Sequence, residues 1–276
     1  MARGELPMTS GGTGSGPSAI AAPLGAVAGM LSFGRRTFAA TGRSIVTGRF
    51  PVAETVVQAW TAIKVCTLPA LAVSVPFGII LALQVGVLSQ EVGAVAFTGA
   101  GNTLAVVRQA SPLITALMLA GVAGSAICAD LGSRTIREEI DAMEVMGLPV
   151  IERLVVPRMV AIVVVAVLLN GVVMFFTIMT TLLISTVLQD LPPGAYLASV
   201  TTLAQLSDLW LSLTKAAIFA VICAVVASYK GLGARRGPTG VGEAVTSAVV
   251  TNFVLLFAAN FLISQVHSTF SGGMIG

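Results

Sequence analysis

Charged residues are spaced so that the chain falls into long uncharged stretches. Residues 65–90, 109–129 and 159–189 carry no charge, Lys215 alone interrupts the stretch between Asp208 and Lys230, and no charged residue follows Glu243. About 20 apolar residues cross the ~30 Å hydrocarbon layer of a bilayer, so each stretch is long enough to span it. The pattern predicts an all-α integral membrane protein with five transmembrane helices, at about 65–90, 106–130, 156–189, 208–230 and 243–267.

Residues 92–107 are uncharged but too few for a comfortable span. They number only 16 and include Gly93, Gly99 and Gly101. Glycine weakens a helix and is common in turns. The segment is therefore expected to be either a loop leading into the next helix or a re-entrant piece.

The residues before the first span fall into two parts. Residues 1–18 are rich in Gly, Ser and Pro, which is typical of a flexible tail. Within 19–63, apolar residues share one helical stripe and arginines lie off it, which predicts an amphipathic helix on the inner face of the membrane. A helix packed on a protein partner is the alternative. The stripe is Ile20, Leu24, Val27, Leu31, Phe38 and Ile45, and the arginines are Arg35, Arg36 and Arg43.

Cationic residues gather on one side of the predicted spans. Thirteen of the 15 Lys and Arg lie before the first span, between the second and third, or between the fourth and fifth. The opposite loops, 85–107 and 190–207, contain Glu91 and Asp190 and no cation. Cytoplasmic loops carry the excess of Lys and Arg. We expect a multi-pass protein of the inner (plasma) membrane with a cytoplasmic N-terminus and an external C-terminus.

Composition narrows the class of function. The 276 residues are 56% hydrophobic and 10% charged, whereas a soluble domain carries about 25% charged residues. This excludes a cytosolic enzyme and a nucleic-acid-binding module. Three cysteines (Cys66, Cys128 and Cys223) lie in apolar runs with one scattered His, so no metal site is predicted. The sequence offers no nucleophile–base pair, and we expect a protein that is not an enzyme and holds no cofactor.

A short charged helix is predicted at 135–146, between the second and third spans. Thr135 with Glu138 has the form of a capping box, and Gly147 with Pro149 is a stop signal. Such a helix suits docking on a soluble protein, although a solvated helix without a partner is the alternative. The candidate docking residues are Arg134, Thr135, Arg137, Glu138, Glu139, Asp141 and Glu144.

Polar residues within the spans are candidates for substrate binding, since charges in a bilayer are expensive. Lys215 lies 15 residues before Lys230, or ~22 Å from the cytoplasmic end of its span. The same arithmetic places Arg108 and Asn260 in the outer half, with Gln109 adjacent. We expect Arg108, Gln109, Lys215 and Asn260 to line a cavity that meets the polar part of a substrate. The alternatives are that Arg108 reaches the interface and that Lys215 satisfies backbone carbonyls.

Two further patterns concern packing. In the second span Ala116, Ala120, Gly124 and Cys128 recur every four residues, which is typical of closely packed membrane helices. A second row consists of Gly121, Ser125 and Ala129. We expect this span to be central to the bundle or to an interface with a second membrane subunit. Pro69 and Pro76 should bend the first span.

The run AGVAGSAICADLGSRTIREEIDAMEVMGLPVIERLVVPRMVA, residues 120–160, resembles the signature of the MlaE/YrbE permease family. Within this run the order of residues resembles that of A-type YrbE permeases of actinobacterial Mce lipid transporters. The similarity continues through LTKAAIFA (213–220), SYKGL (228–232) and GPTGVGEAV (237–245), which defines an MlaE-like permease domain at 64–270.

The resemblance implies the membrane subunit of an ATP-driven (ABC-type) importer of lipids. It implies a paralogous B-type permease as partner, a cytoplasmic ATPase that uses the ATP and docks on 135–146, and external Mce proteins that deliver the lipid. Family members often carry Glu and Asp where this chain has the neutral Gln109 and Asn260, which argues against a proton relay there. The alternative function is an autonomous transporter driven by an ion gradient, which would favour inverted repeats and carboxylates deep in the spans.

Overall fold

The computed structural model describes residues 21–46, 51–203, 205–235 and 237–272. Within these ranges the chain is helical and has no strand. Five long helical stretches can cross a membrane by length and composition, so the prediction of five spans is confirmed. They are Val52–Glu91, Val95–Ile136, Ile151–Leu188, Leu206–Leu232 and Pro238–Thr269. The predicted tail at 1–18 lies outside the described residues.

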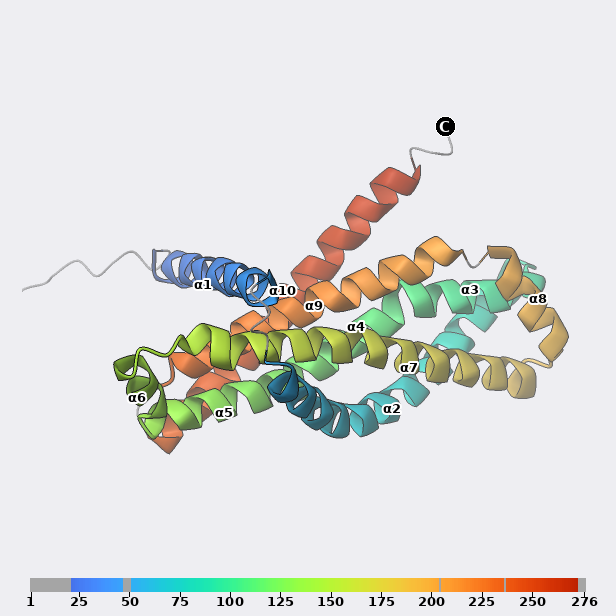
Figure 1. Ribbon diagram of the computed structural model, residues 1–276. Coiled ribbons are helices and arrows are strands. Elements are labelled where there is room, and N and C mark those ends of the chain that lie inside the picture. Colours follow the sequence, from blue (N-terminus) through green and yellow to red (C-terminus); the bar gives the residue numbers. More distant parts are fainter. Residues whose placement is uncertain (1–20, 47–50, 204, 236, 273–276) are drawn as a thin grey trace, which may run out of the picture.

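The first span is the single helix α2 (Val52–Glu91), which bends along its length (Figure 1). Pro69 and Pro76 lie inside it, and each removes one backbone donor from the helix. Its inward face is built from small residues four apart, which allow α7 to approach closely. These are Cys66, Ala70, Ser74, Gly78, Ala82 and Gly86.

Residues 92–94 form a short turn after α2, and the rest of 92–107 begins the second span, as the predicted loop leading into a helix would do. A 3₁₀ turn, η1 (Val95–Phe97), leads into α3 (Thr98–Ala105). Two π-helical turns follow, each succeeded by α-helix. In order these are η2 (Val106–Ala110), α4 (Ser111–Met118), η3 (Leu119–Ala123) and α5 (Gly124–Ile136).

The remaining spans cross the bundle beside these two. A π-helical turn, η4 (Ile151–Val155), opens the third span and continues as α7 (Val156–Leu188). The fourth is α9 (Leu206–Leu232) and the fifth α10 (Pro238–Gly272). The outer half of α10 diverges from the other helices (Figure 1). The two short helices, α6 (Glu139–Val145) and α8 (Pro193–Leu203), lie at opposite ends of the bundle.

Helix α8 closes the end of the bundle opposite α6. The Tyr196 hydroxyl lies 2.9 Å from that of Thr181 on α7, and the backbone N–H of Ala100 donates to Ser199 Oγ at 3.1 Å. Burial raises the pKa of the Tyr196 hydroxyl, and its hydrogen bond with Thr181 opposes that rise. The hydroxyl therefore stays protonated at neutral pH and can hold α8 against α7.

Helix α1 (Ala21–Val46) precedes the spans and has two different faces. One face packs on the bundle, where Phe33 stacks on Tyr229 of α9 with ring centroids 5.8 Å apart. Leu31 and Phe38, both in the predicted apolar stripe, are exposed. A helix thus lies where one was expected, with apolar side chains left for lipid or a partner. Its placement on the membrane surface stays a prediction.

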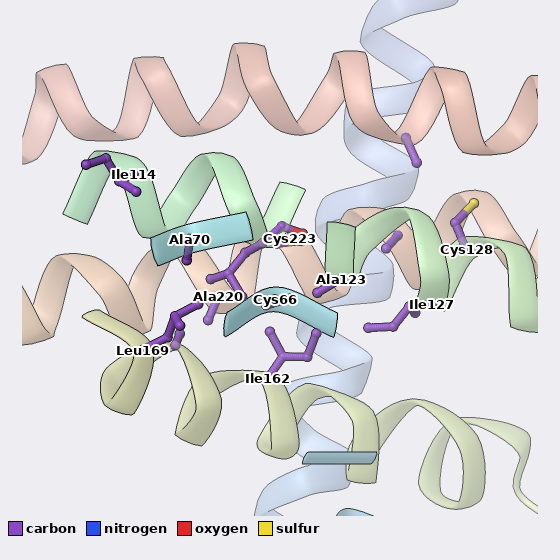
Figure 2. Packing of buried hydrophobic residues seen from close by; sticks show 14 of the residues in the cluster. Cys66, Ala70, Ile114, Ala123, Ile127, Cys128, Ile162, Leu169, Ala220 and Cys223 are labelled. Carbon is purple, nitrogen blue, oxygen red and sulfur yellow. Dashed lines mark hydrogen bonds between the residues drawn. The ribbon is translucent and has the colours of Figure 1, made fainter. Parts of the chain in front are cut away.

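The core is a cluster of buried apolar side chains drawn from all five spans, 14 of which Figure 2 shows. Ala or Cys occupies nine of its 16 buried positions, so the helix backbones approach closely. The predicted row of Ala116, Ala120, Gly124 and Cys128 is buried, whereas Gly121, Ser125 and Ala129 are only partly so. Membrane helices associate through such close contact rather than through a hydrophobic drive. The second span is therefore central to the bundle.

The contact between α5 and α9 provides a test of this packing. A Cβ added to Gly231 would lie 2.9 Å from the carbonyl oxygen of Cys128 and 2.9 Å from the Cβ of Leu131. We expect Gly231→Ala to lower the free energy of unfolding by about 1–3 kcal/mol, because the helices would have to separate. Thermal unfolding of the detergent-purified chain measures this.

Gly171→Ala on α7 is the matched control, since nothing lies within 4 Å of a Cβ at that position. It should be neutral or stabilise by up to about 1 kcal/mol, because Ala favours a helix over Gly. Equal destabilisation by both changes would contradict the packing described for α5 and α9.

Candidate functional site

The half of the bundle nearer α8 brings together three of the four predicted substrate-binding residues. Arg108 and Gln109 lie in the π-helical turn η2, and Lys215 projects from α9. The Lys215 ammonium donates to the Arg108 carbonyl (2.9 Å), Gln109 Oε1 (3.3 Å) and Ser264 Oγ on α10 (2.9 Å). An ammonium has three donors, so all three are used, and none of these partners is a carboxylate. Lys215 thus ties the second, fourth and fifth spans together.

Asp208, which in the sequence served only as a span boundary, is the acid of this cluster. Arg108 Nε donates to its Oδ1 at 2.7 Å, and the side chain of Asp208 is 3% exposed against 44% for Arg108. The backbone N–H of Gln205 also approaches Asp208 Oδ2, at 3.4 Å. The pair fastens the start of α9 to the second span and leaves the guanidinium partly exposed. The sequence did contain a signal for this pair, because Arg108 and Asp208 lie equally far from the opposite ends of their spans, the second and the fourth.

Asn260 lies on α10, one helical turn before Ser264. Its Oδ1 is buried and accepts no hydrogen bond from the described residues. Such an orphan acceptor costs about 1–3 kcal/mol if nothing satisfies it. The arrangement places all four residues near one level, but that they line a cavity and meet a lipid stays a prediction.

A buried polar network lies deeper, and it was not predicted from the sequence. Ser111 Oγ donates to Asn170 Oδ1 at 3.0 Å, and Asn170 Nδ2 donates to Ser212 Oγ at 2.9 Å. The three residues come from α4, α7 and α9 and are fully buried. Hydrogen bonds between membrane helices contribute about 0.6 kcal/mol each on average. The network therefore fixes the register of three spans and leaves little polar capacity for a ligand.

The end of the bundle that carries α6 differs from the prediction of one helix at 135–146. Helix α5 continues to Ile136, and the Thr135 hydroxyl donates to the Leu131 carbonyl at 2.9 Å, so Thr135 is not the N-cap. Glu138 takes a left-handed conformation (φ 58°), which breaks the helix before α6 begins at Glu139. The predicted capping box is wrong because residues 124–136 propagate as one helix. A left-handed residue is then needed to turn the chain.

Helix α6 exposes an apolar edge beside acidic residues. Ile140 is buried against the bundle, whereas Val145 is 90% and Met146 66% exposed. Asp141 and Glu144 are exposed on the same short helix. Val145 and Met146 were not among the predicted docking residues. Two apolar residues directly before Gly147, which ends the helix, could have indicated an exposed apolar edge. The predicted docking residues are divided between two helices. Helix α5 carries Arg134 and Thr135 and ends before Arg137, and α6 carries Glu139, Asp141 and Glu144.

Ion pairs join α5 to its neighbours at this end. Arg158, 1% exposed at the start of α7, donates to Asp130 Oδ2 and, at 2.6 Å, to the Leu154 carbonyl. Arg134 donates to Asp130 at 3.3 Å and lies 3.6 Å from Glu139. Arg137 is 3.0 Å from Glu139. The described residues contain no group of three His, Cys, Asp or Glu that could hold a metal ion.

The three hydrogen bonds of Lys215 provide a second test of how the spans are held together. Lys215→Met removes three hydrogen bonds and leaves the carbonyl of Arg108 with one partner fewer in a nonpolar setting. We expect a loss of about 1–3 kcal/mol in the free energy of unfolding, measured by thermal unfolding in detergent. Lys230→Met, on the same helix but half-exposed at its end, is the control and should shift it by less than about 0.5 kcal/mol. Similar shifts in the two variants would argue against a tether at Lys215.

Comparison with known proteins supports one assignment. The family model described as Permease MlaE matches residues 55–266. A probable ABC transporter permease protein of Synechocystis is 34% identical over 187 residues, covering 68% of this chain and 71% of that protein. A probable ABC transporter permease protein of Rickettsia conorii is 29% identical over 201 residues, covering 72% and 78%. The chloroplast protein TRIGALACTOSYLDIACYLGLYCEROL 1 of Arabidopsis thaliana is 30% identical over 162 residues, covering 59% and 46%. The chain therefore belongs to the MlaE family of ABC transporter permeases.

Proposed function

We propose that the chain is the permease subunit of an ATP-driven lipid import system of the Mce type, as the resemblance to A-type YrbE permeases implies. It has no enzymatic activity of its own in this proposal. It pairs with a paralogous B-type permease, receives lipid from external Mce proteins and lies in the inner membrane. Membership of an ABC permease family implies an ATPase partner, and α6 is the proposed docking element.

The observation that carries this proposal is the exposed edge of α6. Val145 and Met146 present apolar surface that the bundle does not cover, and Asp141 and Glu144 flank them. An apolar centre with a charged rim is the usual anatomy of a protein interface. The ion pairs of Asp130 and Arg158 connect α6 through α5 to α7, so force applied at α6 would reach two spans.

The distribution of charge supports an α6 end that faces the cytoplasm. Arg134, Arg137 and Arg153 flank α6 in the sequence, Lys230 lies in the last turn of α9, and Arg235 lies between α9 and α10. Helix α6 and the turn between α9 and α10 lie at the same end of the bundle (Figure 1). The opposite end carries Glu91 and Asp190. The positive-inside rule then favours the predicted orientation.

The outermost spans support pairing with a second permease. In the most apolar window of α2 only 22% of residues are buried, and in that of α10 only 17%, against 44–56% in the other three spans. Helix α10 exposes Val254, Phe257 and Phe261 on its diverging outer half. A second permease would cover part of this surface, and lipid the rest.

A lipid substrate is supported by the outer cluster. Arg108 keeps 44% of its side chain exposed while paired with Asp208, and Lys215 adds a second positive charge. An acidic lipid head would balance the charge of Lys215, whose partners are all neutral, and Asn260 Oδ1 could accept from a hydroxyl. The Arabidopsis relative's name refers to trigalactosyldiacylglycerol, a lipid. Reconstitution separates this from the ion-gradient alternative, since transport by the chain alone without ATP would refute the ABC proposal.

Charge reversal on α6 tests the docking role. Glu144→Lys should reduce co-purification of the ATPase at least tenfold, because it places a cation at the rim of the proposed interface. Glu91→Lys is the matched control, since Glu91 is also an exposed acid at a helix end but lies at the other end of the bundle. It should leave the ATPase bound. Loss in both variants, or in neither, would mean that α6 is not the docking element.

The substrate role of Asn260 can be separated from bundle stability. Asn260→Leu keeps side-chain size and removes an acceptor that bonds to none of the described residues. We expect about a fivefold fall in lipid retained by the purified complex, measured by mass spectrometry, as the loss of a hydrogen bond worth ~1 kcal/mol implies. Gln265→Leu, an exposed position on the same helix, should retain normal lipid. Unchanged lipid in Asn260→Leu would remove Asn260 from the site.

A further inference from the structure

A crevice of about 260 Å³ lies between α2, α5 and α7, near the end of the bundle that carries α6. It has room for roughly eight water molecules, or for the polar head of a lipid. Its lining comes from four residues of α2, the stretch 123–134 of the second span, and two residues of α7. It is separate from the cluster around Lys215, which lies in the opposite half of the bundle.

The depth of this crevice in the membrane is marked by its α2 wall. Trp60 is 59% exposed, and the Lys64 ammonium lies 4.9 Å from the centre of its ring. Exposed Trp and Lys side chains of this kind sit at the level of lipid head groups. Thr61 and Val65, which line the crevice, belong to the same turns of α2. The crevice therefore opens at the boundary between head groups and acyl chains.

The walls are polar at one end and apolar at the other. Asp130, Arg134 and Arg158 form the end nearer α6, and Val65, Ile127 and Ile162 form the end nearer the middle of the membrane. A ligand that fits both ends has a polar head and a hydrocarbon tail. The order of the two ends matches that of a lipid in the surrounding leaflet.

Charge selects the head group. Arg158 is buried and fully engaged with Asp130 and a carbonyl, while Arg134 keeps 33% of its side chain exposed. With Arg137 and Glu139 included, three guanidinium groups face two carboxylates in this chain of ion pairs. Arg134 has five donors, more than its contacts with Asp130 and Glu139 use, so it keeps donors for a further anion. Guanidinium forks suit phosphate.

We propose that this crevice binds one phospholipid from the leaflet at the α6 end, with the lipid phosphate on Arg134 and the first carbons of an acyl chain against Val65, Ile127 and Ile162. In the orientation proposed above this is the cytoplasmic leaflet. The site holds whether or not the outer cluster binds transported lipid. The wall of the crevice includes the last turns of α5, which lead directly into α6. Occupation of the crevice would therefore affect the position of the docking helix.

Photolabelling tests the site without requiring transport. The full-length chain is placed in phosphatidylcholine nanodiscs that contain a phosphatidylethanolamine with a diazirine on its acyl chain, and labelled residues are found by mass spectrometry. Label on 61–65 and 123–127 is divided by label on Leu183 and Val187, two exposed apolar residues of α7 outside the crevice. Val65→Trp, which fills the crevice, should lower this ratio at least fivefold. Leu68→Trp, an exposed position on the same helix outside the crevice, should leave it within twofold.

The head group is tested with diacylglycerol carrying the same diazirine chain, which should label the crevice at least threefold less than phosphatidylethanolamine. Arg134→Gln should remove that difference. Equal labelling by the two lipids in the unmodified chain, or a ratio unaffected by Val65→Trp, would overturn the proposal. So would a disulfide formed by Val65→Cys between two copies of the chain, because protein rather than lipid would then cover the crevice.

Discussion

A charge within a bilayer has to find its partners inside the protein, and this requirement organises the bundle. Near its outer end the second span is bonded to α9 through Arg108 and Asp208, and to α9 and α10 through Lys215. Near its other end it is bonded to α7 through Asp130 and Arg158. Between them, Asn170 joins three helices by neutral hydrogen bonds. The second span thus has polar bonds to the third and fourth spans and is linked to the fifth through Lys215, whereas the first packs through a face of small residues.

The five spans could be predicted because a membrane-spanning helix requires only a continuous apolar run of sufficient length, which can be read along the sequence. A run of about 20 apolar residues without charge is visible in the sequence, and such a run is typical of a membrane-spanning helix. The height of Lys215, Arg108 and Asn260 followed from the rise per residue of a helix, and the structure brings Lys215 and Arg108 into contact. Height alone does not give direction around a helix axis, however. For that reason neither the pairing of Arg108 with Asp208, 100 residues away, nor the network around Asn170 was predicted.

The errors near α6 have a local cause. Thr135 and Glu138 have the right spacing for a capping box, but the same residues also suit the last turn of a longer helix. Packing of α5 on α9 favours continuation to Ile136, and the chain then reverses through Glu138 at a positive φ, which Glu seldom adopts. For residues 92–107 the sequence left two alternatives open, and the structure has a short turn at 92–94 followed by helix. Gly99 and Gly101 lie within a helix, where the absence of a side chain at Gly99 makes room for α8.

The two π-helical turns of the second span have a consequence for the history of the chain. Each holds one residue more than an α-helical turn would, and one residue corresponds to a rotation of about 100°. Because the extra residue is taken up within the turn itself, removing one residue from η2 or η3 would restore regular helix and leave the side chains beyond the turn facing as they do. Insertions and deletions inside a membrane helix are normally ruinous. These two turns are the places where such an event could be accommodated, and within η2 it would change the direction of Arg108 or Gln109 without disturbing the rest of the span.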